Sequence, residues 1–372
     1  MPAPALALQA VTPDALASRL GVTLAEARKI VSTVHRWRSL DEPLQGVRRT
    51  SLDAVRSHGS IPTLGLFARL ASAVDPFVKF ALETPDTQLI ETVRIPLEKA
   101  GRFSVCVSSQ IGCALACAFC ATGRLGLKRN LETWEIVEQV RTVARELQVA
   151  NAESAASASG AAGAGEVPAR ARVHGVVFQG MGEPMSNLDR VLEAIFVLCD
   201  PSALAIDARA MTVCTAGVPS GIRRLAREAP KVRLGLSIGS ARPEVRRSLM
   251  PIARANPLDE VLEAAAEHAR TTGLAPMWAV TPLAGVNDTE EDGRALGVLA
   301  RRFAEKTGVR PRISVIPYNA IDDEGRDPFA RSTDAREVAF RAALRDAGFG
   351  SHKRYSGGGD VNAACGQLAA KA

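Results

Sequence analysis

Long apolar runs are missing from this chain of 372 residues. No stretch reaches the roughly 20 apolar residues that a membrane-spanning helix requires, so we expect no contact with a membrane. The sequence also lacks a basic segment followed by an apolar one near its start, so we expect no signal peptide and a location in the cytoplasm. In that reducing compartment structural disulfides are unexpected, and cysteines serve other chemistry.

A second Cys/His pair is missing from the neighbourhood of the cysteine cluster, which argues against a structural zinc site with its usual four ligands. The cluster consists of Cys113, Cys117 and Cys120, at a C-x3-C-x2-C spacing, just after the apolar run 103–107. Three thiolates on one short loop, here named the cluster loop (residues 113–120), are soft ligands that can converge on a single iron–sulfur cluster. The spacing predicts a [4Fe-4S] cluster with one open iron, which can bind a substrate or cofactor.

Length and charge set further bounds. At 372 residues the chain has room for one large domain and a smaller one. A net charge of +6 and a sequence pI near 9.1 favour a polyanionic partner such as RNA, although many proteins without such a partner carry a similar charge.

Residues 1–76 form the smaller domain in this prediction, with helices from about Val11 to about Leu70. Capping signals at Thr12 and Thr23 precede apolar residues at helical spacing. Two interpretations of its many arginines stay open: a surface that contacts RNA, or a solvated basic face. The basic and aromatic residues in question are Arg36, Arg38, Arg48 and Arg49, beside His35 and Trp37.

A short β-hairpin extension is predicted within residues 77–102, because 78–82 and 88–96 alternate between apolar and polar side chains. Glu91 lies inside the second strand. Two interpretations of this carboxylate stay open: it faces solvent, or it is a proton acceptor placed in a site.

From 103 to 350 strands and helices alternate, which predicts an α/β fold with six β/α units, a parallel sheet and a partial (β/α)6 barrel. Residues 151–166 are small and of low complexity, and we expect a flexible surface insertion there. Residues 351–372 form a C-terminal tail. Strands are expected at 103–107, 173–178, 210–215, 232–238, 276–281 and 312–316, and helices at 133–147, 188–199, 221–227, 258–271, 289–307 and 333–347.

Candidate functional residues follow the predicted strands, where the active sites of barrels lie. Gly180-Met-Gly182-Glu183-Pro follows the second strand, and its glycines allow the backbone to approach a ligand closely. Glu183 can pair with an ammonium group. Ser237 ends the fourth strand, and Asn319 follows the sixth, either as a ligand contact or as a turn residue.

Two cysteines lie outside the cluster loop at informative places, Cys106 seven residues before it and Cys365 in the tail. A lone cysteine is most often a small buried hydrophobe. These two can instead form a redox pair, because the Gly-rich segment 356–359 lets the tail fold over the mouth of the barrel.

Four segments, taken in order, resemble the RlmN/Cfr family of radical S-adenosylmethionine RNA methyltransferases. The Gly-Glu-Pro of the segment 180–184 is closer to RlmN, because Cfr proteins tend to have Ala after the Glu. The resemblance implies methylation of C2 of adenine 2503 in 23S rRNA and of adenine 37 in tRNA. Cfr-like methylation of C8, or of another RNA adenosine, is the alternative, and a non-catalytic iron–sulfur RNA-binding or redox protein is a remote one. The segments are 105–123, 126–131, 180–184 and 364–368, within a similarity that covers roughly residues 77 to 370.

The resemblance also implies the site residues. The three clustered cysteines hold the [4Fe-4S] cluster, which cleaves S-adenosylmethionine to a 5′-deoxyadenosyl radical. Cys365 carries the methyl group as S-methylcysteine, Cys106 releases the product through a transient disulfide, and Glu91 accepts the proton. A reducing electron donor such as flavodoxin is an implied partner, and the protein is expected to be a monomer. S-adenosylmethionine is expected at Gly182, Glu183, Cys214, Ser237, Ile238, Gly239 and Asn319.

Several positions depart from the family's usual pattern. The usual Ser-Leu-His after the fourth strand is here Ser237-Ile238-Gly239, and a usual Ser in the third strand is Cys214. An Arg that usually precedes the tail motif is replaced by Gly357. None of these positions is a predicted cluster ligand or one of the two catalytic thiols, so they bear on the RNA target and on the cofactor contacts.

Overall fold

A ten-stranded sheet organises the computed structural model, which describes residues 5–159, 170–321 and 327–369. Seven neighbouring strands are parallel, and the last three continue the sheet in antiparallel pairing. Side chains on this sheet form the main core with the helices. The strand order is β14 (Ser351–Lys353), β13 (Arg312–Val315), β12 (Met277–Val280), β11 (Arg233–Ser237), β10 (Met211–Thr215), β9 (Arg172–Phe178), β6 (Arg102–Val107), β5 (Leu89–Pro96), β4 (Val78–Glu83) and β3 (Gly65–Ala71).

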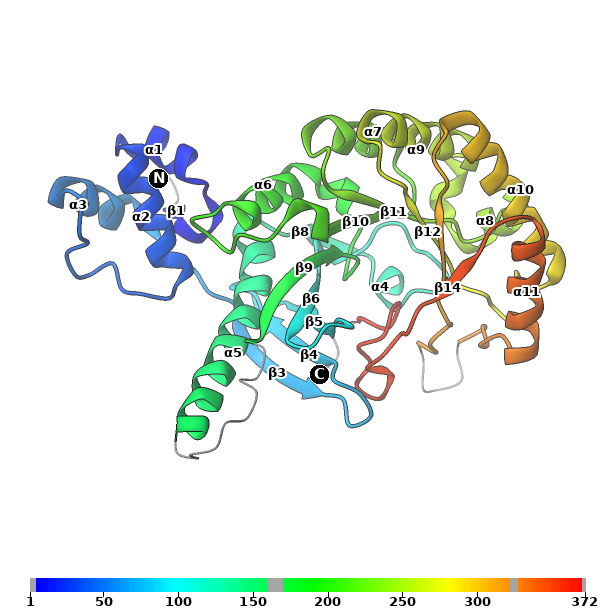
Figure 1. Ribbon diagram of the computed structural model, residues 1–372, viewed down its shortest axis with the longest axis horizontal. Helices are drawn as coiled ribbons and strands as arrows, with labels where there is room; N and C mark the ends of the chain where they lie inside the picture. Colours follow the sequence, from blue (N-terminus) through cyan, green and yellow to red (C-terminus); the bar gives the residue numbers. More distant parts are fainter. Residues whose placement is uncertain (1–4, 160–169, 322–326, 370–372) are drawn as a thin grey trace.

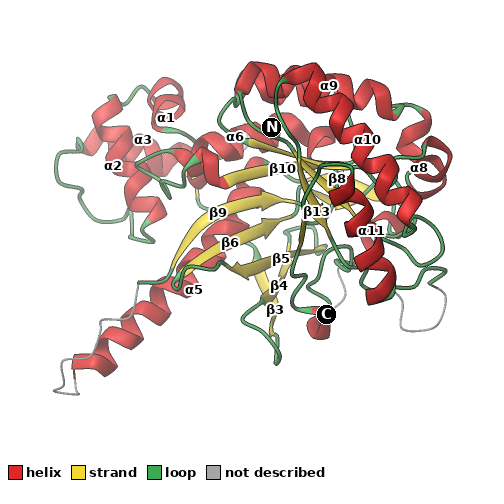
Figure 2. Cartoon of the chain, turned by 45° about the vertical axis from the view of Figure 1, so that its right-hand side comes forward, coloured by secondary structure: helices red, strands yellow, loops and turns green. Residues whose placement is uncertain are grey.

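Helices cover the outer face of the parallel strands, and the sheet curves into a partial barrel (Figures 1 and 2). The predicted α/β fold class is confirmed. Burial holds the layers together: Trp278 packs edge-to-face on Phe303 with ring centroids 5.2 Å apart, and burial of one such side chain contributes ~1.5–3 kcal/mol. The helices are α5 (Thr133–Ser159), α6 (Leu188–Cys199), α7 (Pro219–Glu228), α9 (Leu258–Thr272), α10 (Glu290–Thr307) and α11 (Asp334–Asp346), with the short α4 (Ala121–Arg124) and α8 (Pro243–Leu249).

The structure differs from the prediction in three elements. β3 begins at Gly65, inside the range predicted as helical, so the antiparallel extension has three strands rather than two. α5 continues to Ser159, and residues 151–159 of the predicted insertion are therefore helical; their alanines favour a helix. Residues 160–166 lie outside the described residues. β14 was not predicted, because a three-residue edge strand carries too little pattern to detect.

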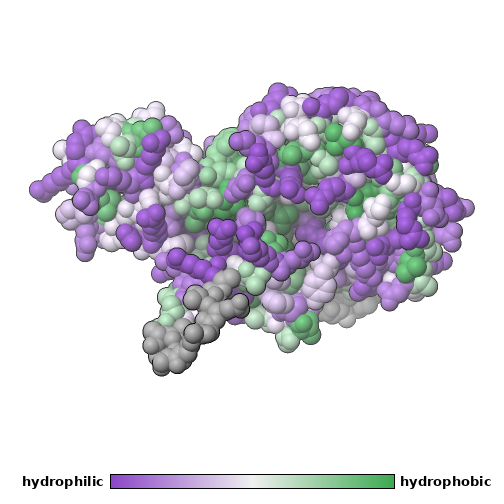
Figure 3. Space-filling view, viewed as in Figure 1, coloured by the Kyte–Doolittle hydropathy of each residue, from purple (hydrophilic) through white to green (hydrophobic). Residues whose placement is uncertain are grey.

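The N-terminal helices form a separate small core around Leu16, Ile30 and Val55. They lie to the left of the barrel in Figure 1. Figure 3 shows hydrophobic side chains gathered over α6, beside these helices. No described helix is both long enough and apolar enough to cross a membrane. The elements are β1 (Leu6–Ala7), α1 (Pro13–Leu20), α2 (Leu24–His35), α3 (Arg49–His58) and β2 (Gly59–Ser60).

Candidate active site

The cluster loop lies between β7 (Gln110–Gly112) and α4, at the carboxyl end of β6. Positive φ angles at Gly112 (74°) and Ala116 (50°) turn the chain sharply at this point. A Cβ on Gly112 would lie 1.7 Å from the carbonyl oxygen of Gly126, just before β8 (Leu127–Asn130), so only glycine fits. The tight turn holds the three cysteines on one compact loop.

The donor set fits a cluster with three cysteine ligands. Burial raises the pKa of the Cys113 thiol to about 11 and that of Cys117 to about 12, and the neighbouring thiol of Cys120 adds to both shifts. Three thiols that influence one another in this way can share one iron–sulfur cluster. Within the described ranges no group of three or more His, Cys, Asp or Glu is arranged around a single metal ion. The cysteines of an iron–sulfur cluster each bind a different iron, so they need not converge on one point.

Glu183 is a buried carboxylate behind this loop, with 4% of its surface exposed. One oxygen accepts the backbone N–H of Met185 at 3.0 Å and the other accepts that of Ala216 at 2.8 Å. Burial raises the pKa of Glu183, and within the described residues no Lys or Arg forms an ion pair with it. A buried carboxylate without its own cation suits an incoming ammonium group, as the sequence predicts.

The glycines beside Glu183 pack against the chain itself, and the predicted approach to a ligand stays a prediction. A Cβ on Gly180 would lie 2.7 Å from the carbonyl of Val107, and one on Gly182, where φ is 95°, would lie 2.5 Å from the Cβ of Gln110. The turn therefore packs against the chain's own segment after β6. That contact places Glu183, whose N–H donates to the Gln110 side chain at 2.8 Å, beside the cluster loop.

Ser237 and Gly239 line one wall of a small cavity of about 60 Å³. Ile238 points into the core and is fully buried. Arg246 of α8 orders this segment: it is 1% exposed, and its guanidinium donates to the carbonyls of Ser237 and Ala216, at 2.8 and 2.6 Å. Burial lowers its pKa to about 10.

The departure at Gly239 has a local explanation. Its φ is 69°, a left-handed conformation, and a Cβ there would lie 2.6 Å from the sulfur of Met250. The histidine that is usual in the family at this position would be strained in this backbone. The cavity beside Gly239 is correspondingly free of an imidazole.

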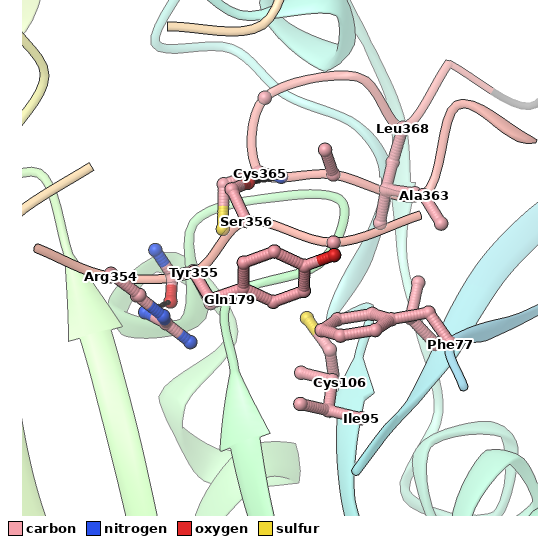
Figure 4. A pocket seen from close by; sticks show the side chains of 14 residues that line it. Phe77, Ile95, Cys106, Gln179, Arg354, Tyr355, Ser356, Ala363, Cys365 and Leu368 are labelled. Carbon is pink, nitrogen blue, oxygen red and sulfur yellow. Dashed lines mark hydrogen bonds between the residues drawn. The ribbon is translucent and has the colours of Figure 1, made fainter. Parts of the chain in front are cut away.

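Cys365 lines two cavities. One is the cavity of Ser237 and Gly239, and the other, of about 40 Å³, also contains Cys106. Each has room for roughly one or two waters, so a nucleoside enters only if the tail moves. Figure 4 shows the sulfurs of Cys106 and Cys365 reaching the second cavity from β6 and from the tail. All seven cysteines are free in this structure, so the predicted Cys106–Cys365 disulfide is not formed.

Asn319 contacts the tail. Its side-chain amide donates to Ser356 Oγ at 3.0 Å and to the Cys365 carbonyl at 3.3 Å, and the Cys365 N–H donates to the same Ser356 Oγ at 3.3 Å. The predicted contact with adenosine stays a prediction. In this arrangement Asn319 fixes the backbone that carries the predicted methyl carrier.

Further contacts hold the tail at both ends. Asp75, in the turn between β3 and β4, accepts the Tyr355 hydroxyl at 2.9 Å and the Gly358 N–H at 2.8 Å. At the other end, Thr122 of α4 donates to the carbonyl of Leu368 at 2.6 Å. The tail therefore lies across the barrel mouth from the antiparallel extension to the helix that follows the cluster loop.

Gly357 is explained by the same contacts. A Cβ at this position would lie 2.5 Å from both a carboxylate oxygen of Asp75 and the ring of Phe77. The arginine that is usual in the family would not fit against these two side chains.

Glu91 does not face solvent, so that interpretation is wrong: it is 1% exposed. Its carboxylate accepts Lys79 Nζ at 2.8 Å and the backbone N–H of Ala369 at 2.8 Å. Val93, two residues on, pairs directly with Cys106 across β5 and β6, so Glu91 and Cys106 lie on the same face of the sheet. Glu91 is therefore a buried carboxylate on the same face of the sheet as Cys106, two residues along β5 from the partner of that cysteine.

No protein-family model matches this chain. Curated RNA methyltransferases, however, resemble most of its length. A probable RNA methyltransferase of Sorangium cellulosum is 58% identical over 373 aligned residues, which cover 96% of this chain and 90% of that protein. The dual-specificity RNA methyltransferase RlmN of Syntrophobacter fumaroxidans is 37% identical over 299 residues, covering 80% of this chain and 78% of that one. This chain belongs to the RlmN family.

A solved structure agrees with this membership. The crystal structure of a radical SAM methyltransferase from Sphaerobacter thermophilus has a TM-score of 0.82 and 31% identity to this chain, and it covers 98% of this chain and 100% of its own. The RlmN-family fold therefore extends over the N-terminal helices, which the sequence motifs did not reach.

Three residues of this RlmN-family site were missed by sequence reasoning. Gln179, directly after β9, lines both cavities, and its side-chain carbonyl accepts the Cys214 thiol at 3.6 Å and Arg354 Nη1 at 3.0 Å. Its place at a strand end was the available signal. Arg354 follows the unpredicted β14, and Lys79 is recognisable only through its pairing with Glu91. Cys214 itself is buried beside Gln179.

Proposed function

We propose that the chain is a radical S-adenosylmethionine methyltransferase that methylates C2 of adenine in 23S rRNA or tRNA, with Cys365 as the methyl carrier. The observation that supports it most is the position of Cys365 between two cavities. One contains Ser237 and Gly239 of the expected cofactor segment, and the other contains Cys106. A carrier must reach both a methyl donor and an acceptor, and the position of Cys365 between the two cavities supports this role.

Cys365 begins the cycle as a nucleophile. Its thiolate attacks the methyl carbon of S-adenosylmethionine, a carbon–sulfur bond forms as the sulfonium–methyl bond breaks, and S-adenosylhomocysteine leaves. When bound at Cys113, Cys117 and Cys120, the [4Fe-4S] cluster supplies the electron for reductive cleavage of a second S-adenosylmethionine. An aromatic sp² carbon such as C2 is no nucleophile toward a sulfonium, which is why a carrier is needed.

Cys106 and Glu91 act after the methyl carbon has joined adenine. The sulfur of Cys106 attacks that of Cys365 to form the disulfide, and the bond between Cys365 sulfur and that carbon breaks. The electron pair of the broken bond stays with the carbon, which takes up a proton to complete the methyl group. The disulfide must then be reduced, and an electron donor such as flavodoxin would separately supply the cluster. Glu91 is proposed as the acceptor of the C2 proton, since its carboxylate is enclosed on the same sheet face as Cys106. Glu183 would bind the ammonium group of S-adenosylmethionine.

The RNA is proposed to contact the N-terminal helices through part of their basic set. Arg36, Arg38 and Arg49 are exposed. Two other members serve packing instead, because His35 is 2% exposed and the Trp37 ring lies 5.3 Å from the Arg141 guanidinium of α5. The exposed arginines can approach phosphates.

The test uses anaerobically reconstituted enzyme with S-adenosylmethionine, a reductant and protein-free 23S rRNA or tRNA. Nucleosides are analysed by mass spectrometry. We expect 2-methyladenosine with the unaltered chain and with Cys199→Ala, a cysteine of α6 outside both cavities, and none with Cys365→Ala. Formation of 8-methyladenosine would show Cfr-like chemistry instead. Cleavage of S-adenosylmethionine without any methylated RNA would refute the proposed substrates.

A further inference from the structure

Arg354 lies at the base of the tail, directly after β14. Its backbone N–H donates to the carbonyl of Val315 at 2.8 Å, which continues the pairing of β14 with β13. Its Nη1 donates to the side-chain carbonyl of Gln179 at 3.0 Å. The backbone of Arg354 is therefore fixed by β13 and its guanidinium by Gln179, and the side chain lines the cavity of Cys106 and Cys365 (Figure 4).

The groups that face this guanidinium are thiols. Cys106 comes from β6, Cys214 from β10 and Cys365 from the tail, and each interacts electrostatically with Arg354. Within the described residues no carboxylate forms an ion pair with Arg354, and Glu183 acts on Cys214 rather than on the arginine. An enclosed cation without a carboxylate is costly unless another anion accompanies it, and an ionised thiol is the anion available here.

Arg354 and the thiols around it shift each other's pKa. Burial works against the charged form of Arg354, yet Cys365, Cys214 and Cys106 outweigh it and raise the arginine's pKa. Burial raises the pKa of Cys106 and of Cys214 to about 12, and Arg354 lowers both. The arginine is thus the cation that offsets the cost of a thiolate in this cavity.

We propose that Arg354 is a positioning residue whose positive charge orients the sulfur of Cys365 for attack on a methyl group. The inference rests on the proposed function of Cys365 as carrier. Gln179 fixes the guanidinium, and Asn319 with Ser356 fixes the Cys365 backbone, so both groups are held in place before a ligand arrives.

The same cation serves a second thiol later in the cycle. Methylation turns Cys365 into a neutral thioether, while Arg354 keeps its charge. The positive charge of the cavity is then uncompensated, which favours loss of the proton from Cys106, the other thiol that lines it. Arg354 would therefore support the two thiols in the order in which the reaction uses them.

The test measures the reactivity of Cys365 without RNA or S-adenosylmethionine. Anaerobic, cluster-loaded enzyme is pulsed with iodoacetamide over a range of pH, and the alkylated peptides of Cys365 and Cys199 are quantified by mass spectrometry. In Arg354→Gln we expect the Cys365 rate near neutral pH to fall about tenfold, because the positive charge beside its sulfur is lost. Arg354→Lys, which keeps the charge, should restore most of the rate. Arg294→Gln, a surface change on α10, should have no effect.

The Cys199 rate reports whether each variant is folded. If Arg354→Gln does not fold, Gln179→Leu replaces it: the cation stays but loses its anchor, and we expect a fall of about threefold. An unchanged Cys365 profile in the folded variant would overturn the proposal, and so would Arg354→Lys behaving like Arg354→Gln. Failure of the unaltered enzyme to methylate RNA would instead refute the proposed function and leave the alkylation result standing.

Discussion

The buried Lys79 and the half-buried Arg354 are cations with different surroundings. Lys79 is paired with Glu91 at 2.8 Å, and both side chains are at most 3% exposed, so the charges cancel within the sheet. Arg354 has a neutral amide and three thiols around it. A paired charge is complete without a ligand, whereas an unpaired one changes the ionisation of whatever lies beside it. The first arrangement stabilises the sheet around the proposed proton acceptor, and the second acts on the sulfur of the proposed methyl carrier.

Breaking the paired site should have the largest effect. Glu91→Ala leaves Lys79 buried without its carboxylate, and we expect the free energy of unfolding to fall by ~3–5 kcal/mol. The measurement is urea unfolding followed by circular dichroism. Lys79→Met combined with Glu91→Leu removes both charges and should recover most of the loss. A double variant as unstable as the single one would show that packing rather than charge explains the effect.

The next largest expected loss of stability comes from disturbing the tail that carries Arg354 and Cys365. Gly357→Ala puts a methyl group against Asp75 and Phe77, and we expect a cost of ~1–3 kcal/mol for the tail contacts. Hydrogen exchange of residues 354–365 should accelerate. Gly359→Ala is the matched control, because a Cβ there meets nothing within 4 Å. Equal exchange in the two variants would contradict this account.

A smaller effect concerns the thiols beside Arg354. The pKa of Cys214 is raised to about 12 in the folded chain, above its ordinary value of 9.0. Between these values the unfolded chain loses the proton first, so the free energy of unfolding decreases as pH rises, by at most ~1.4 kcal/mol per pH unit for one group. Cys214→Ser should flatten this decrease and leave stability below pH 8 with an unchanged pH dependence. Urea midpoints across pH check it.

Removal of the unpaired cation should have the smallest effect on stability. Arg354→Met loses one hydrogen bond to Gln179 but also the cost of a buried charge, and we expect a change within ~1 kcal/mol. Urea unfolding next to Glu91→Ala checks the contrast directly. A loss as large as that of Glu91→Ala would mean that Arg354 is structural, like Lys79.

Local patterns predicted some of this molecule well and not the rest. The spacing of Cys113, Cys117 and Cys120, and the helix 188–199, follow from neighbours in sequence, and the α/β alternation was confirmed. The same reasoning could not place Glu91, because its enclosure depends on Lys79 across the sheet and on Ala369 in the tail. Arg354 was invisible for the same reason: its partners come from β6, β9, β10 and the tail.

Glycines illustrate the limit in another way. The sequence marks Gly182, Gly239 and Gly357 as special, but it cannot say what occupies the space that a side chain would take. The structure fills that space with Gln110, Met250, and Asp75 with Phe77, respectively. Two departures from the family pattern are thus consequences of neighbouring side chains.

The two cavities beside Cys365, of about 40 and 60 Å³, have a thermodynamic consequence. Where a ligand binds only when the tail is open, its measured affinity is weakened in proportion to the fraction of molecules with an open tail. A ligand that holds the tail open strengthens the binding of the next one, and the coupling free energy is the same in both directions. The methyl donor and the RNA acceptor would therefore each change the affinity of the other through the opening of the tail.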